Sequence, residues 1–214
     1  MMNMRRSQIG IYGIILISFI ISTYFYPQMP DEMASHWNAH GQVDGYLPKF
    51  WGLFLIPFTL IGLALLLVAI PKIDPLKENI EKFRKYYDGF IFLFFIFMLL
   101  IHLQMILWNI GIKINPNILF PIGFGPLLFY IGVLCEKTKR NWFIGIRTPW
   151  TLSSARVWEK THKVGGKLFK IAGVIALLGV FFQDYALFLI LIPAILTAIY
   201  TIIYSYLEYQ KEIK

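Results

Sequence analysis

The chain has 214 residues, of which 57% are hydrophobic and only 15% are charged, and its mean hydropathy is +0.62. Soluble domains carry about 25% charged residues, so the composition excludes a disordered chain and argues against a soluble enzyme. The single cysteine, Cys135, excludes an internal disulfide and a cysteine-rich metal cluster. The net charge of +8 has to be interpreted by position, because basic loops set the orientation of membrane proteins.

Six hydrophobic stretches organise the sequence. They cover residues 9–26, 50–70, 89–108, 118–135, 168–182 and 185–207. A membrane-spanning helix needs roughly 17–25 apolar residues, and five of the stretches meet that length. The fifth is shorter, but Lys167 and Lys170 at its start can extend toward the headgroups. Because the runs are continuously apolar, they favour helices over barrel strands. The sequence therefore predicts an all-α polytopic membrane protein with six transmembrane helices.

The first stretch is preceded by Arg5 and Arg6, as a signal peptide would be. It ends in Thr-Tyr-Phe-Tyr-Pro at 23–27, without the small residues of a cleavage site. We expect it to remain as the first transmembrane helix. The predicted division of the chain is residues 1–70, with two helices and an outer loop, and residues 71–214, with four helices and an inner segment.

Lys and Arg are distributed unevenly among the loops. Seventeen of the twenty lie in the N-terminal segment, in the loops after the second and fourth stretches, and in the C-terminal tail. Only Lys49 and Lys113 lie in loops of the opposite side. The positive-inside rule therefore predicts that both termini are cytoplasmic. Contact with anionic membrane lipids explains the basic charge, and no direct nucleic-acid partner is predicted.

The outer loop contains the segment PDEMASHWNAHGQVDGY at residues 30–46. We expect Asp31 to cap a short helix in which Met33 and Trp37 share a face that lies on the membrane. Gly41 fits the end of that helix. The dipeptide at 44–45, Asp-Gly, is a turn signal.

His36 and His40 in this loop are four residues apart. On a helix, that spacing lets two imidazoles bind one metal, and Asp31 and Asp44 would add oxygen ligands. In the alternative interpretation, His36 packs against Trp37 and bonds the loop backbone, while His40 is solvated. The glutamate that a zinc-protease motif places after the first histidine is absent. We predict no metal and no cofactor.

Two polar residues, His102 and Gln104, lie inside the third hydrophobic stretch. Polar side chains in a membrane interior are candidates for function. His102 is a candidate proton-relay group. The alternative is a neutral imidazole that is hydrogen-bonded to a neighbouring helix.

The inner loop contains GIRTPWTL at residues 145–152. Ser153 or Ser154 is expected to cap a helix that runs toward residue 164. On that helix Trp158, Thr161, His162 and Gly165 would recur along one side.

Three tryptophans of the inner loop, Trp142, Trp150 and Trp158, are expected at headgroup level. Arg147 among these aromatics is a candidate to bind lipid phosphate, a peptide carboxylate or an aromatic ring. Two interpretations of the segment stay open. It is either an anchor that clamps the fourth helix to the fifth, or a surface that binds a partner.

The residues of both loops form recognisable patterns. The inner pattern resembles the signature of the SdpI immunity-protein family, and it consists of Asn141, Gly145, Arg147, Thr148, Pro149, Trp150, Thr151, Trp158, His162 and Gly166. The outer pattern resembles a small domain of unknown function that often begins such proteins, and it consists of Pro30, His36, Trp37, Asn38, Gly41, Asp44 and Gly45.

The resemblance implies a multi-pass protein of the bacterial cell membrane that gives resistance to a secreted antimicrobial peptide toxin. It also implies a second partner, a cytoplasmic helix-turn-helix repressor held at the membrane when toxin is present. The outer motif and the adjoining helix ends would then bind or exclude the toxin, with His102 as a further candidate contact for it, and the inner motif would report to the repressor. The alternatives are a small-molecule or peptide transporter with a cavity near His102, and a structural membrane protein without a toxin partner. No enzyme is predicted, because nucleophile-elbow, phosphate-loop and Ser-x-x-Lys motifs are absent from the sequence.

Overall fold

The computed structural model describes residues 6–213, so that Arg5 and Lys214 of the predicted basic side lie outside the described residues. Six long helices dominate this range: α1 (Arg6–Phe25), α2 (Lys49–Ile73), α4 (Arg84–Asn109), α5 (Pro116–Lys137), α7 (Ala155–Leu178) and α8 (Ala186–Ile213). The short elements between them are η1 (Tyr26–Gln28), β1 (Glu32–Trp37), β2 (Val43–Pro48), α3 (Lys77–Glu81), α6 (Pro149–Ser153) and η2 (Gln183–Tyr185).

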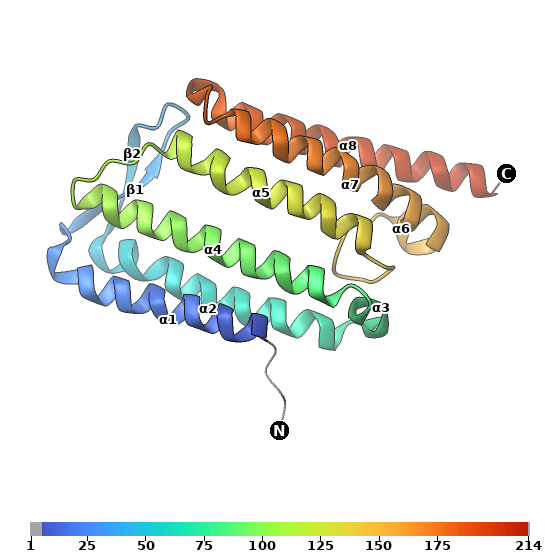
Figure 1. Ribbon diagram of the computed structural model, residues 1–214, viewed down its shortest axis with the longest axis horizontal. Coiled ribbons are helices and arrows are strands. Elements are labelled where there is room, and N and C mark those ends of the chain that lie inside the picture. Colours follow the sequence, from blue (N-terminus) through green and yellow to red (C-terminus); the bar gives the residue numbers. More distant parts are fainter. Residues whose placement is uncertain (1–5, 214) are drawn as a thin grey trace.

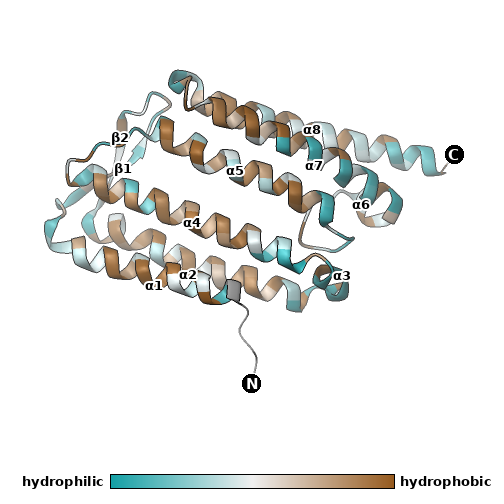
Figure 2. Cartoon of the chain, viewed as in Figure 1, coloured by the Kyte–Doolittle hydropathy of each residue, from teal (hydrophilic) through white to brown (hydrophobic). Residues whose placement is uncertain are grey.

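The long helices run back and forth in chain order across the molecule (Figure 1). The β1–β2 hairpin lies at one end of this bundle, and α3 and α6 lie at the other. Figure 2 shows that hydrophobic residues fill the middle of the helices and that hydrophilic residues gather toward the ends. This banding is what a bilayer requires, with an apolar core about 30 Å thick between polar interfaces.

Five helices, α1, α2, α4, α5 and α8, are long and apolar enough to cross a membrane. Many of their large apolar side chains point outward, among them Leu65, which is 70% exposed. The chain is therefore a mostly helical, multi-pass membrane protein. The two-stranded hairpin is the departure from the all-α prediction.

The sixth long helix, α7, differs from the other five because its first half is basic. The predicted helix toward residue 164 and the predicted span at 168–182 are one continuous helix that ends at Leu178. Ser154 caps it as predicted, since its hydroxyl accepts the N–H of Val157 at 3.2 Å. Because its first half is basic, α7 is not among the five helices that are apolar enough to be candidate membrane spans.

Two pairs of glycines bring α7 against α5. A Cβ atom at Gly132 would lie 2.4 Å from the carbonyl oxygen of Gly166, and one at Gly173 would lie 2.6 Å from that of Gly125. In each helix the two glycines are seven residues apart, about two turns, so the same faces meet twice. Small residues at such contacts let two helix backbones approach closely, which stabilises helix pairs in membranes.

Ion pairs connect α7 to both of its neighbours. Lys170 lies 2.6 Å from a carboxylate oxygen of Glu136 on α5, and Lys160 pairs with the buried Glu208 on α8. Lys211 on α8 also contacts Glu208, at 2.8 Å. The basic half of α7 therefore packs between α5 and α8 with part of its charge neutralised.

We predict that Gly132→Ala destabilises the bundle by roughly 1–3 kcal/mol, the usual cost of overpacking. The added methyl group would overlap the Gly166 carbonyl, which is backbone and has little freedom to move. Gly62→Ala is the matched control, because a Cβ atom there meets nothing within 4 Å. It should be neutral or stabilising, since Ala favours a helix over Gly by about 1 kcal/mol. Thermal unfolding in detergent micelles measures the stability of both variants. Equal changes of the unfolding temperature in the two variants would contradict the glycine contact.

Candidate functional site

The outer motif forms a β-hairpin, so the short helix predicted from Asp31 to Gly41 is wrong. β1 and β2 pair antiparallel, with Met33 opposite Leu47 and Trp37 opposite Val43. The turn predicted at 44–45 is also wrong, since both residues lie in β2 and the chain reverses at 38–42.

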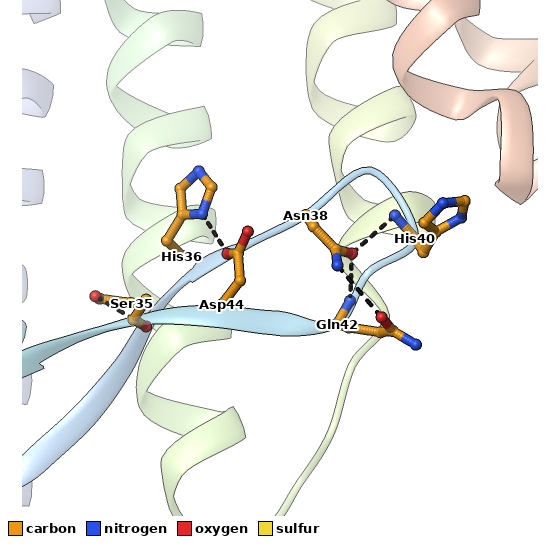
Figure 3. A network of polar contacts seen from close by, with 7 residues as sticks. Ser35, His36, Asn38, His40, Gln42 and Asp44 are labelled. Atoms are coloured by element: carbon orange, nitrogen blue, oxygen red, sulfur yellow. Dashed lines mark hydrogen bonds and ion pairs between the residues drawn. The ribbon is translucent and has the colours of Figure 1, made fainter.

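Asn38 builds the turn of the hairpin (Figure 3). Its side-chain oxygen accepts the backbone N–H groups of His40 and Gln42 at 2.9 and 3.0 Å. Gly41 takes a φ of +73°, which favours glycine. The sequence signal for this turn was Asn-x-x-Gly at the centre of the segment.

The two histidines of the outer motif lie apart. His36 contacts Asp44 across the strands, whereas His40 lies on the turn (Figure 3). Gly45 permits the strands to approach here, because a Cβ atom on it would lie 2.9 Å from the Cβ of His36. The helical spacing on which the paired-histidine metal site depended is therefore not formed, and residues 6–213 hold no group of three potential metal ligands.

Asn109, at the end of α4, holds the hairpin on the bundle. Its side-chain oxygen accepts the N–H of Ala34 at 2.8 Å, and its amide nitrogen donates to the Ala34 carbonyl at 3.0 Å. The carboxamide thus pairs with β1 as a neighbouring strand would. The Trp37 ring packs edge to face on Trp108, with 5.4 Å between ring centroids, and Met33 is fully buried beneath the hairpin.

A small cleft of about 180 Å³ lies between the hairpin turn and the ends of α5 and α8. Trp37 and Asn38 line its hairpin side, and Phe120 and Leu187 are among its apolar walls. The Trp37 ring nitrogen is buried without a hydrogen-bond partner in the described part of the chain. Of the predicted outer residues, Trp37 and Asn38 therefore border this cleft, while His36, Asp44 and Pro30 are exposed outside it.

The intramembrane histidine links three helices. Nε2 of His102 lies 3.0 Å from the Ser22 hydroxyl, which donates to the Leu53 carbonyl at 2.7 Å. Because the Ser22 hydroxyl proton is donated to the Leu53 carbonyl, the imidazole N–H donates to the Ser22 oxygen. Gln104 reaches the carbonyl of Ile114 at 3.5 Å. His102 thus has the geometry of a helix-linking imidazole, and its Nδ1 is buried without a partner among the described residues.

Asn141 organises the start of the inner motif. Its buried side-chain oxygen accepts the N–H groups of Phe143 and Ile144 at 2.9 and 2.6 Å. Its amide nitrogen donates to the carbonyls of Lys139 and Ile144. One buried side chain therefore closes the loop that follows α5.

His162 and Trp158 of α7 receive this loop. His162 Nε2 accepts the N–H of Ile146 at 2.9 Å, and Nδ1 donates to the Trp158 carbonyl at 2.8 Å. Gly145 has a φ of +115°, and a Cβ atom on it would lie 2.5 Å from Nε2. The indole ring of Trp158 and the imidazole ring of His162 stack with 4.0 Å between their centroids. Trp158 is only 2% exposed, so its ring packs inside the protein and not against lipid headgroups, while its depth in the membrane stays a prediction.

The threonines of the motif connect α6 to α8. Thr148 and Thr151 cap α6 reciprocally, and the Thr148 hydroxyl lies 3.0 Å from that of Ser205. Trp150 contacts the ring of Tyr206 at 5.1 Å. Asn141, Thr148, Thr151, Trp158 and His162 are all buried, and Gly166 lies in the contact with α5.

Arg147 and Trp142 are the part of the inner segment that faces outward. The Arg147 guanidinium donates to the Trp142 carbonyl at 2.9 Å, and the Trp142 side chain is 53% exposed. The inner segment therefore has a buried part that joins helices and an exposed part that a partner can reach.

Both motifs fall in segments that match known families. Residues 137–205 match the SdpI/YfhL protein family, and residues 13–61 match a domain of unknown function, DUF1648. The chain is 24% identical over 209 residues to the protein named Immunity protein SdpI from Bacillus subtilis (strain 168), a match that covers 97% of this chain and 98% of that protein. No solved structure gives a significant match. These matches confirm the resemblance to the SdpI family that the two motifs indicated.

The buried position of His162 predicts a pH-dependent stability. Burial lowers the pKa of His162 from 6.5 to about 4, and protonation of Nε2 would break the bond from Ile146. As pH falls below 6.5 the unfolded chain takes up a proton that the folded chain does not, so the free energy of unfolding decreases. We expect the unfolding temperature in detergent to fall between pH 7 and pH 5, and to fall less in His162→Gln.

His40→Gln is the control for that measurement, because His40 is exposed on the hairpin turn. It should keep the pH dependence of the parent protein. An equal pH dependence in the parent protein and in His162→Gln would contradict the neutral, doubly hydrogen-bonded imidazole.

Proposed function

We propose that this chain is a membrane immunity protein that gives a bacterium resistance to a secreted antimicrobial peptide. The observation that carries the proposal is the end-to-end similarity to a protein named for immunity, which includes both motif-bearing segments. A match of this extent favours a shared role more than a shared short motif does.

The proposal includes six membrane crossings with both chain ends in the cytoplasm. The distribution of Lys and Arg supports this orientation. The packing of α7 between α5 and α8 supports α7 as the sixth crossing, although it is not apolar enough to be recognised by hydropathy. The hairpin would then face the outside, where a secreted peptide arrives.

The hairpin and its cleft are the proposed contact for the peptide. Asn109 fixes the hairpin to α4, so the cleft lies on a supported surface. Aromatic side chains in such positions contribute large contact area at low entropic cost. The Trp37 ring nitrogen, buried without a described partner, is a donor that a peptide carbonyl would satisfy.

The proposal assigns Arg147 and Trp142 to a cytoplasmic helix-turn-helix repressor. Their exposure at the basic end of the bundle supports this assignment. The buried residues of the inner motif instead support the helix clamp. The transporter alternative needs His102 to line a transport path. The hydrogen bond from His102 to Ser22 instead favours a structural role for this histidine.

Expression in a peptide-sensitive bacterium tests the proposal. The parent chain should raise the peptide concentration that cells survive, and Trp37→Ala should lower that concentration by roughly tenfold, as loss of a central aromatic contact does. Trp51→Ala is the matched control, because Trp51 is 50% exposed on α2 near the hairpin and lies outside the cleft. Immunoblots of membranes report abundance. A parent chain that gives no protection contradicts the proposed function.

Arg147→Lys in the same cells separates the repressor from protection. Lys keeps the charge but loses the planar set of donors. We expect weaker recruitment of the repressor to membranes, with survival and abundance unchanged. Loss of survival at normal abundance and normal recruitment would contradict the assignment of Arg147 to the repressor.

A further inference from the structure

A basic cavity of about 610 Å³ lies at the end of the bundle opposite the hairpin, between α3, the end of α5 and the first half of α7. Five basic side chains line it: Lys137, Lys139, Arg140, Lys163 and Lys167. Two carboxylates, Glu136 and Glu159, also line it. The excess of positive charge sets this cavity apart from the apolar clefts elsewhere on the bundle.

The charges of the cavity are only partly neutralised. Glu136 is already paired with Lys170 at 2.6 Å, so Glu159 is the remaining carboxylate. Lys139, Lys163 and Lys167 have no carboxylate within salt-bridge distance in the described part of the chain. Like charges gathered in a concave site repel one another and raise the local concentration of anions.

The cavity lies where a membrane interface is expected. Lys137 ends the apolar helix α5. An apolar cleft of about 310 Å³ lies beside it and shares Cys135 with it, and its walls include Phe90, Leu134 and Phe169. Cationic and apolar surfaces placed side by side at this depth suit a ligand with an anionic head and a hydrocarbon tail.

We propose that this cavity binds a phosphate-bearing anion through Lys139, Lys163 and Lys167. A lysine ammonium is a compact point charge that suits phosphate oxygens. The phosphate can come from the headgroup of an anionic phospholipid or from free phosphate in solution. The neighbouring apolar cleft favours the phospholipid. This inference is independent of the immunity function.

Native mass spectrometry of the full-length protein in detergent tests the proposal. The probes are dioleoyl phosphatidylglycerol, dioleoyl phosphatidylcholine, which has no net charge, and inorganic phosphate. The variant is the double substitution Lys163→Gln with Lys167→Gln. The matched control is Lys72→Gln with Lys77→Gln, which removes the same charge from exposed lysines at the same end but outside the cavity.

We expect the parent protein and the control to bind phosphatidylglycerol more tightly than phosphatidylcholine. The cavity variant should bind phosphatidylglycerol roughly tenfold more weakly, because each lysine near an anionic headgroup contributes substantially to binding. Competition by millimolar inorganic phosphate would identify free phosphate as a ligand of the same site. Two results would overturn the proposal when inorganic phosphate also has no effect. One is equal binding of both lipids, and the other is an equal loss of phosphatidylglycerol binding in the cavity variant and the control. Thermal unfolding without lipid verifies that both variants fold.

Discussion

The close approach of α5 and α7 is the constraint on which the rest of the structure depends. Two glycine contacts hold α7 against α5 although the first half of α7 is basic. That position brings Trp158 and His162 to the loop after α5, where Gly145 leaves room for the imidazole. It also places Lys163 and Lys167 beside the end of α5, which creates the basic cavity. A larger side chain at Gly132 or Gly173 would disturb all of these features at once.

The two ends of the bundle are built by the same physical device. At one end, the carboxamide of Asn109 satisfies both backbone groups of Ala34 and so fixes the hairpin. At the other, the carboxamide of Asn141 satisfies the backbone of its own loop. Unpaired backbone groups are costly wherever protein or lipid excludes water. Side-chain amides can supply a donor and an acceptor together, so these two asparagines permit irregular backbone at the ends of the helices.

The long helices could be predicted because continuous apolar runs are the strongest signal in a membrane sequence. The turn of the hairpin had a signal in Asn38 and Gly41, but its docking could not be predicted, because it depends on Asn109, which is 75 residues from Ala34 in the chain. The burial of Trp158 could not be predicted, because it depends on contacts with Gly145 and His162 that spacing alone does not reveal. The glycine contact did have a signal. Gly125 and Gly132, like Gly166 and Gly173, are seven residues apart, and this matched spacing on two helices indicates a shared face.

We propose, as the central claim, that α7 crosses the membrane, so that the chain crosses six times. Cysteine labelling in intact cells tests this most directly, in a Cys135→Ala background because Cys135 is the sole cysteine of the sequence. A cysteine at Asp184, in η2 between α7 and α8, should react with an impermeant reagent from outside, as should one at Gln42 in the hairpin turn. A cysteine at Lys163, in the first half of α7, should react only after permeabilisation. Reaction of positions 184 and 163 from the same side would show that α7 does not cross, and would contradict the account.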